Sequence, residues 1–186
     1  GSLAIRDEVF DAVCKQAGII RVNGDLEELL DVTKAFALQP LPKGNKVAIV
    51  TVSGAGGVMA ADECAKHGLE LAGLSAETLS RIRTRMPSWA VVNNPVDIEP
   101  LFEAIGPEES IKTALGAALE DRNADSIVVL FVAVPRLIPF FNVRNVINHV
   151  KERPLEDKPI LTQFIGFKDT VAVSYTHLRA HETVLD

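Results

Sequence analysis

A continuous apolar run at residues 47–50 passes through a glycine-rich turn into a helical pattern, and this feature constrains the fold more than any other. The run reads Val-Ala-Ile-Val without alternation, which is typical of a strand buried on both faces of a parallel sheet. The turn after it is Ser53-Gly54-Ala55-Gly56-Gly57. The helix that follows is predicted to turn four side chains inward: Val58, Ala61, Cys64 and Ala65. A strand that leads directly into a helix predicts a βαβ unit and therefore an α/β fold.

The same alternation of strands and helices continues on both sides of this run. Apolar runs predict strands at 19–22, 69–71, 126–134 and 159–165. Helical spacing and capping residues predict helices at 7–17, 26–37, 75–86, 107–119 and 141–150. Aromatic residues are only 5% of the chain, and the aliphatic bias suits buried parallel strands under alanine-rich helices. The pattern predicts a three-layer α/β/α architecture with a mainly parallel sheet.

Breaks in the pattern divide the chain into four parts. Prolines and a glycine mark residues 40–45 as a linker between a first unit, 1–39, and a second domain, 46–173. The second domain is predicted to be incomplete, because its alternation stops soon after its last strand. Residues 174–186 contain the only tyrosine and two of the four histidines, and they resemble a translated cloning or sequencing-adapter sequence. They are therefore predicted to be a non-native read-through tail with no part in the fold.

Net charge and cysteine content narrow the class of protein. The net charge of −6 argues against a protein that binds the phosphate backbone of nucleic acids. Cys14 and Cys64 lack metal-ligand spacing and lie among apolar neighbours, so we expect two buried free thiols in a reducing compartment. No apolar run reaches the roughly 18 residues of a membrane span, and no signal peptide is visible. These features predict a cytoplasmic protein.

The glycine-rich turn is the first candidate site. Glycines let a ligand approach the backbone, and the first-turn N–H groups and dipole of the helix favour an anion. We therefore predict phosphate binding by Ser53-Gly54-Ala55-Gly56-Gly57. Met59 stands where the dinucleotide fingerprint needs glycine, and a P-loop would need Gly-Lys-Ser/Thr, so neither standard nucleotide motif is met. On spacing alone, a tight turn in which the glycines only relieve crowding is an equal alternative.

Asn94-Pro95-Val96-Asp97 is the second candidate site. Asn94 and Asp97 would belong to a crevice loop at the carboxyl ends of the strands. The alternative is a turn in which Asn and Asp bond their own backbone, and the residues alone favour this turn. His177 and His181 have the i, i+4 spacing of a metal pair, but no third ligand is near in sequence. We therefore predict no metal site within the chain.

Several segments also carry a family resemblance through their joint order and spacing. They are Gly1-Ser2-Leu3-Ala4, the stretches 17–22, 37–40 and 47–62, then Leu69-Glu70-Leu71, Leu74-Ser75 and Asn94-Pro95-Val96-Asp97. Over roughly residues 1 to 173, the chain resembles the NDP-forming (ADP-forming) acyl-CoA synthetases, which are related to succinyl-CoA synthetases. Two segments depart from the family pattern. Residues 52–57 replace the Asn-Ala-Gly-Gly-Pro-Gly of many members, and Ile98-Glu99-Pro100 replaces the usual Thr-Gly.

The resemblance implies a truncated flavodoxin-like, succinyl-CoA synthetase-like fold. Residues 1–39 would be the C-terminal part of a first CoA-ligase domain, and residues 46–173 an incomplete second one. The parent would be an acetate–CoA ligase of the ADP-forming type, which interconverts acyl-CoA, ADP and phosphate with acid, CoA and ATP through a phosphohistidine. The family's histidine precedes a Thr-Gly-Ser-Leu-Ala segment, so it is expected just before Gly1, and the chain alone is expected to be inactive.

The resemblance also implies which cofactors and partners the parent needs. The parent would use ATP or ADP, Mg²⁺ and CoA, and none of these would be bound by this chain alone. CoA-binding and ATP-grasp domains, or a subunit that carries them, would complete the enzyme. Two alternatives stay open: a synthetase-like regulatory region of a protein lysine acetyltransferase, and a stand-alone flavodoxin-like ligand-binding module.

Overall fold

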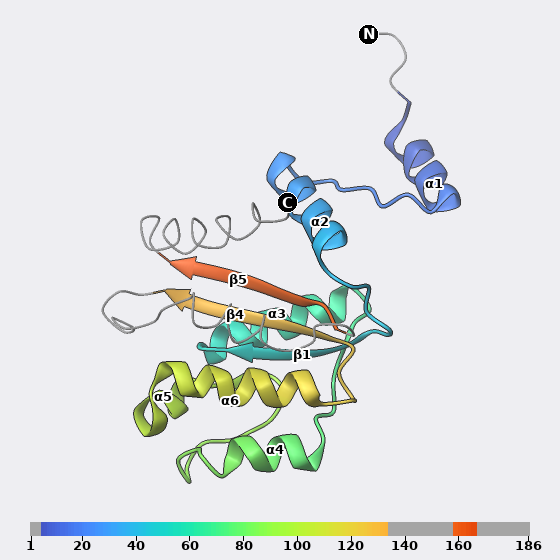
Figure 1. Ribbon diagram of the computed structural model, residues 1–186. Coiled ribbons are helices and arrows are strands. Elements are labelled where there is room, and N and C mark those ends of the chain that lie inside the picture. Colours follow the sequence, from blue (N-terminus) through green and yellow to red (C-terminus); the bar gives the residue numbers. More distant parts are fainter. Residues whose placement is uncertain (1–4, 134–157, 167–186) are drawn as a thin grey trace, which may run out of the picture. The chain divides into compact units, whose positions relative to one another are not determined.

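The computed structural model describes residues 5–133 and 158–166, which fall into two compact units (Figure 1). The first unit is Gly1–Gln39 and the second is Pro40–Asp186. The helix predicted at 141–150 and the tail predicted at 174–186 lie outside the described residues.

Residues 5–39 of the first unit contain two helices whose ends match the sequence signals. Helix α1 spans Asp7–Ala17 and ends at Gly18, whose φ of 66° is the left-handed conformation that glycine permits. Helix α2 spans Leu26–Leu38, and the Asp25 carboxylate accepts a hydrogen bond from the Glu28 amide at 3.0 Å. The apolar sides of both helices remain exposed in this unit: Val9, Phe10, Val13, Leu26, Leu29, Leu30 and Phe36.

The strand predicted at 19–22 is wrong. The segment does not pair into a sheet, and Ile20 is 62% exposed. A strand needs a neighbour for its backbone hydrogen bonds, and the described residues of this unit offer only helices and turns. Arg21 holds the segment to α1 instead, because its guanidinium donates to the carboxylates of Asp11 at 2.6 Å and Asp7 at 3.0 Å.

The second unit is built on a parallel sheet, as predicted. Among its described residues the strands are β1 (Lys46–Thr51), β2 (Glu70–Leu71), β3 (Val96–Asp97), β4 (Ser126–Ala133) and β5 (Ile160–Gly166). The order across the sheet is β2-β1-β4-β5, while β3 pairs with the carboxyl end of β1. Each of these pairings is parallel, and in Figure 1 the arrowheads of β4 and β5 point the same way, toward the carboxyl edge.

Helices cover both faces of this sheet. Alternate residues of a strand point to opposite faces, so β1 contributes apolar side chains to the core on each side. Ala48 and Val50 pack into the larger core cluster with three helices, which are α4 (Ala76–Arg83), α5 (Glu99–Ile105) and α6 (Pro107–Glu120). Val47 and Ile49 pack on the other face against Cys64 of α3 (Gly54–Lys66). This is the three-layer α/β/α arrangement that the sequence predicts.

Three details of the helices differ from the prediction. Helix α4 ends at Arg83 rather than near Met86. Helix α5 was not predicted, since a helix of seven residues is too short to show a helical period. In α3, Val58 is 61% exposed and Gly57 is buried. Cys64 and Ala61 pack toward the sheet as predicted, whereas Val58 and Ala65 are exposed, contrary to the prediction.

Asn94 fills a gap in the hydrogen bonding along one edge of β1. Its side-chain Oδ1 accepts from the Ile49 amide at 2.9 Å, and its Nδ2 donates to the carbonyls of Val47 at 2.8 Å and Ala72 at 3.0 Å. The residue is only 9% exposed. Since β2 pairs with the start of β1 and β3 with its end, Asn94 bonds to β1 where the two short strands meet. The Val47 carbonyl accepts from the Ala72 amide as well, at 2.9 Å.

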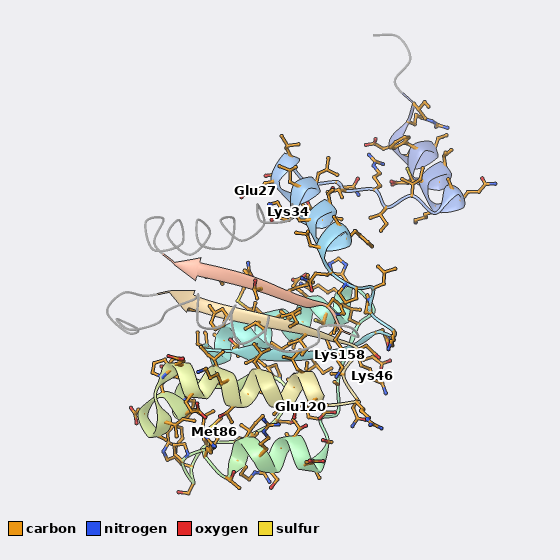
Figure 2. All side chains as sticks on the ribbon, in the orientation of Figure 1. Glu27, Lys34, Lys46, Met86, Glu120 and Lys158 are labelled. Carbon is orange, nitrogen blue, oxygen red and sulfur yellow. The ribbon has the colours of Figure 1, made fainter. Side chains whose placement is uncertain are left out.

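Asp121 is a buried carboxylate at the end of α6 that holds the start of α4. It accepts from the amides of Ser75 at 2.7 Å and Asn123 at 2.9 Å, and it is 3% exposed. Burial raises the pKa of Asp121, but hydrogen bonds from Thr78, Asn123 and Ser75 outweigh burial and leave this pKa below its usual value. The Lys158 ammonium, labelled in Figure 2, donates to the backbone carbonyl of Asp121.

Replacing Asp121 with asparagine should lower the free energy of unfolding at pH 7 by about 1 kcal/mol, because charge-assisted hydrogen bonds weaken. The pKa of this carboxylate is lower in the folded chain than in the unfolded chain. Its stabilisation is therefore present above the unfolded pKa and is lost as the pH falls through the folded pKa.

Urea unfolding should show a difference between wild type and Asp121→Asn that shrinks below about pH 4. The control is Asp62→Asn at an exposed position of α3, which should change stability by less than about 0.5 kcal/mol. A difference between wild type and Asp121→Asn that stays constant under acid conditions would contradict the assigned pKa shift.

Candidate functional site

The carboxyl edge between β1 and β4 is the candidate site of this fold. The chain leaves β1 through α3 toward β2 on one side, whereas β4 is followed by β5 on the other, so the strand order reverses between β1 and β4. In open α/β sheets, ligands bind in the crevice outside the carboxyl ends of the strands at such a reversal. The glycine-rich turn begins just after Thr51, the last residue of β1, and therefore lies at this edge.

Thr51 and Ser53 hold the turn in shape. The Ser53 amide donates to Thr51 Oγ1, and that hydroxyl donates to the Ser53 carbonyl, both at 3.0 Å. Ser53 is also the N-cap of α3, since its Oγ accepts from the Gly56 amide at 3.3 Å. Sequence reasoning missed Thr51, which is 1% exposed. The available signal was a hydroxyl residue at the end of an apolar strand, two positions before the capping serine.

Gly54 and Ala55 present uncommitted backbone amides at the start of α3. Both residues are exposed, and within the described part of the chain neither amide has a hydrogen-bond acceptor. The amides of Gly56 and Gly57 instead donate to Ser53. Free first-turn N–H groups and the helix dipole together favour an anion. The first turn of α3 is therefore chemically suited to a phosphate group.

Gly57 differs from the other residues of the turn because it is buried. A Cβ added to Gly57 would lie 3.0 Å from Pro95 Cβ and 3.0 Å from Thr51 Cγ2. A Cβ added to Gly56 would lie 3.5 Å from the nearest atom, which is ordinary contact. Relief of crowding therefore accounts for Gly57, whereas the exposed residues before it are the ones that a ligand can reach.

The two residues of the predicted crevice loop have different environments in the structure. The Asn94 side chain is buried and fully used by backbone groups of β1 and Ala72. Asp97 is half-buried at the end of β3, and its Oδ1 accepts from the Glu99 amide at 3.1 Å. Its Oδ2 lies 3.1 Å from the position that a Cβ on Gly54 would take. Of the pair, Asp97 is the residue beside the exposed end of α3.

The cysteines are buried free thiols, as predicted. Burial raises the pKa of the Cys64 thiol, which keeps it protonated and unreactive at neutral pH. Across residues 5–133 and 158–166, no group of three or more His, Cys, Asp or Glu side chains is placed to hold a metal ion. In the same residues, no helix has the length and apolar character that crossing a bilayer requires.

The three-layer fold, with a capped helix end at the strand-order reversal, defines a flavodoxin-like α/β domain. Residues 47–184 match the family model described as the Ligase-CoA domain. Because this match covers most of the chain, the chain belongs to the Ligase-CoA domain family, and the predicted family is confirmed.

Two relatives of this chain are ADP-forming acetate–CoA ligases. The ADP-forming acetate–CoA ligase II of Archaeoglobus fulgidus is 48% identical over 122 residues, which are 66% of this chain and 18% of that protein. The alpha subunit of ADP-forming acetate–CoA ligase II of Pyrococcus furiosus is 39% identical over 169 residues, which are 89% of this chain and 35% of that subunit.

A solved structure extends the similarity to the fold. A Ca. Korarchaeum cryptofilum chain described as dinucleotide-forming acetyl-coenzyme A synthetase 1, in complex with phosphate and ADP, superposes with a TM-score of 0.79 at 25% identity. The match covers 97% of this chain and 38% of that chain. The present chain therefore spans well under half the length of these relatives.

Proposed function

We propose that this chain is a segment of an ADP-forming acyl-CoA synthetase of the acetate–CoA ligase type. The parent enzyme would interconvert acyl-CoA, ADP and phosphate with acid, CoA and ATP. Names of relatives that match up to 89% of the chain support this assignment. The structural observation that carries it is the pair of uncommitted amides, Gly54 and Ala55, at the end of a capped helix.

The first turn of α3 would stabilise a phosphoryl group carried by a histidine from a segment outside this chain. Ser53 and Thr51 already fix the turn, so its amides need no rearrangement when charge arrives, and such preorganised donors are the effective ones in catalysis. CoA-binding and ATP-grasp segments, or a partner subunit, would bind CoA and the magnesium nucleotide that exchanges the phosphoryl group. The two free thiols favour a cytoplasmic location for the parent.

Replacing Gly56 with aspartate in the full-length parent should slow phosphoenzyme formation by about tenfold or more. Gly56 has room for a side chain, and an acidic residue in the first turn favours the helix itself, so the fold should be retained. The new carboxylate would repel a phosphoryl group at the amides of Gly54 and Ala55. The measurement is the rate of label transfer from γ-labelled ATP to the protein.

Gly56→Asn is the matched control, because it has the same shape without the charge and should stay within about threefold of wild type. Unchanged phosphoenzyme formation in Gly56→Asp would remove the phosphate assignment. An equal loss in both variants would point to shape rather than charge. Calorimetry of the 186-residue chain with ADP and CoA tests the alternative of a stand-alone binding module, since phosphate binding is expected under both readings.

A further inference from the structure

Asp97 brings a carboxylate to the exposed end of α3. Strand β3 pairs with β1 so that Asp97 lies beside Thr51, and the Ile98 amide donates to the Thr51 carbonyl at 2.8 Å. The Asp97 Oδ1 atom is held by the Glu99 amide at 3.1 Å. The Oδ2 atom faces Gly54 and has no donor among the described residues. The backbone thus fixes this carboxylate at one oxygen and leaves the other beside the free amides.

This arrangement combines two kinds of hydrogen-bonding group at one place. The amides of Gly54 and Ala55 only donate, whereas an ionised Asp97 carboxylate only accepts. A ligand that satisfies both must carry negatively charged oxygens for the amides and an O–H group for Asp97. Inorganic phosphate meets both demands at neutral pH, because it keeps at least one proton. Sulfate has the same tetrahedral shape, but it is fully ionised and offers no donor.

We propose that Asp97 makes this site select phosphate over sulfate, by accepting a hydrogen bond from a protonated phosphate oxygen. The inference rests on the phosphate site proposed above for α3. Sulfate at the same place would bring an unprotonated oxygen next to Asp97 Oδ2. The two negative charges would then repel each other, because no proton lies between them. Repulsion of the wrong ligand is an effective source of specificity, and a missing hydrogen bond at a polar site discriminates strongly. A synthetase that consumes phosphate would thereby exclude a common inorganic competitor.

The test is a titration of the ¹⁵N-labelled 186-residue chain with sodium phosphate and, separately, sodium sulfate at pH 7 and constant ionic strength. The amide shifts of Gly54 and Ala55 report binding. Wild type should bind phosphate at least about tenfold more tightly than sulfate, which is about 1.4 kcal/mol. Asp97→Asn should reduce this ratio to within about threefold, because the asparagine amide can donate to either anion.

Two further variants keep the test decisive. Glu99→Gln removes an exposed negative charge two residues away and should leave the ratio unchanged. Gly54→Ala leaves Asp97 intact but sets a methyl group against its Oδ2, so it should also reduce the preference for phosphate. This variant decides the question if Asp97→Asn fails to fold.

The outcomes separate this inference from the proposed function. Equal binding of both anions by wild type, or a ratio that survives in Asp97→Asn, would overturn the role of Asp97 and leave the phosphate site standing. An equal change in Glu99→Gln would assign the effect to net charge and overturn it as well. If neither anion moves the Gly54 and Ala55 amides in any variant, the phosphate site at α3 is wrong.

Discussion

Replacing Asn94 with aspartate should lower the free energy of unfolding by about 3–5 kcal/mol. The substitution keeps the shape of the side chain but replaces the Nδ2 donor with an oxygen. The Ala72 carbonyl would lose its side-chain donor, and the Val47 carbonyl would keep only the Ala72 amide. Both carbonyls would face a carboxylate oxygen at about the same separation. At 9% exposure, neither water nor a counter-charge compensates easily. Urea unfolding at pH 7, followed by circular dichroism, measures the loss.

Asn93→Asp is the matched control, because it introduces the same charge one residue earlier at an exposed position. It should change the free energy of unfolding by no more than about 0.5 kcal/mol. Similar losses in the two variants would show that added negative charge, and not the bonds of Asn94 to β1, causes the effect. A loss below about 1 kcal/mol in Asn94→Asp would mean that the edge of β1 does not depend on these bonds.

Replacing Gly57 with alanine should destabilise the chain by about 2–3 kcal/mol, because the added methyl group overpacks the contact between α3 and the sheet. The new Cβ would lie 3.0 Å from Pro95 Cβ and from Thr51 Cγ2. Pro95 is a rigid ring and Thr51 is 1% exposed at the end of β1, so neither neighbour moves easily. Thermal and urea unfolding of the same variant measure the loss.

Replacing Gly56 with alanine, one position earlier, should have the opposite effect on stability. Its Cβ would make only ordinary contacts, at 3.5 Å or more, and alanine is a better helix former than glycine. The variant should therefore be more stable than wild type by about 0.5–1 kcal/mol. Effects of the same sign at Gly56 and Gly57 would contradict the division of this turn into a buried packing glycine and a half-buried one with room for a methyl group.

The sequence predicts the fold because the signals of the sheet are local. The apolar runs at β1, β4 and β5 are long enough to identify buried strands without knowledge of their partners. Capping residues identified helix starts equally well, since Asp25 and Ser75 accept the hydrogen bonds expected of an N-cap. These bonds connect residues three apart, so the sequence alone contains both members of each.

The details that escaped prediction depend on neighbours far apart in the chain. Asn94 resembles a turn residue in sequence, and its true partners are 45 and 47 residues earlier in β1. The approach of Asp97 to Gly54 follows from the pairing of β3 with β1, which no local pattern encodes. The apolar segment at 19–22 shows the converse, because strand propensity without a pairing neighbour does not make a strand.

The two short strands β2 and β3 lie in line along the edge of β1 that faces away from β4. Together they occupy one strand position, so α4 and its loops form an insertion within a single interrupted strand. Trp89 and Val91 of this insertion are 71% and 84% exposed. We expect the length of this insertion to tolerate change near Trp89 and Val91 without disturbing the sheet, provided that Asn94 keeps its place beside β1. A single amide side chain thus sets the point at which the chain must rejoin the sheet.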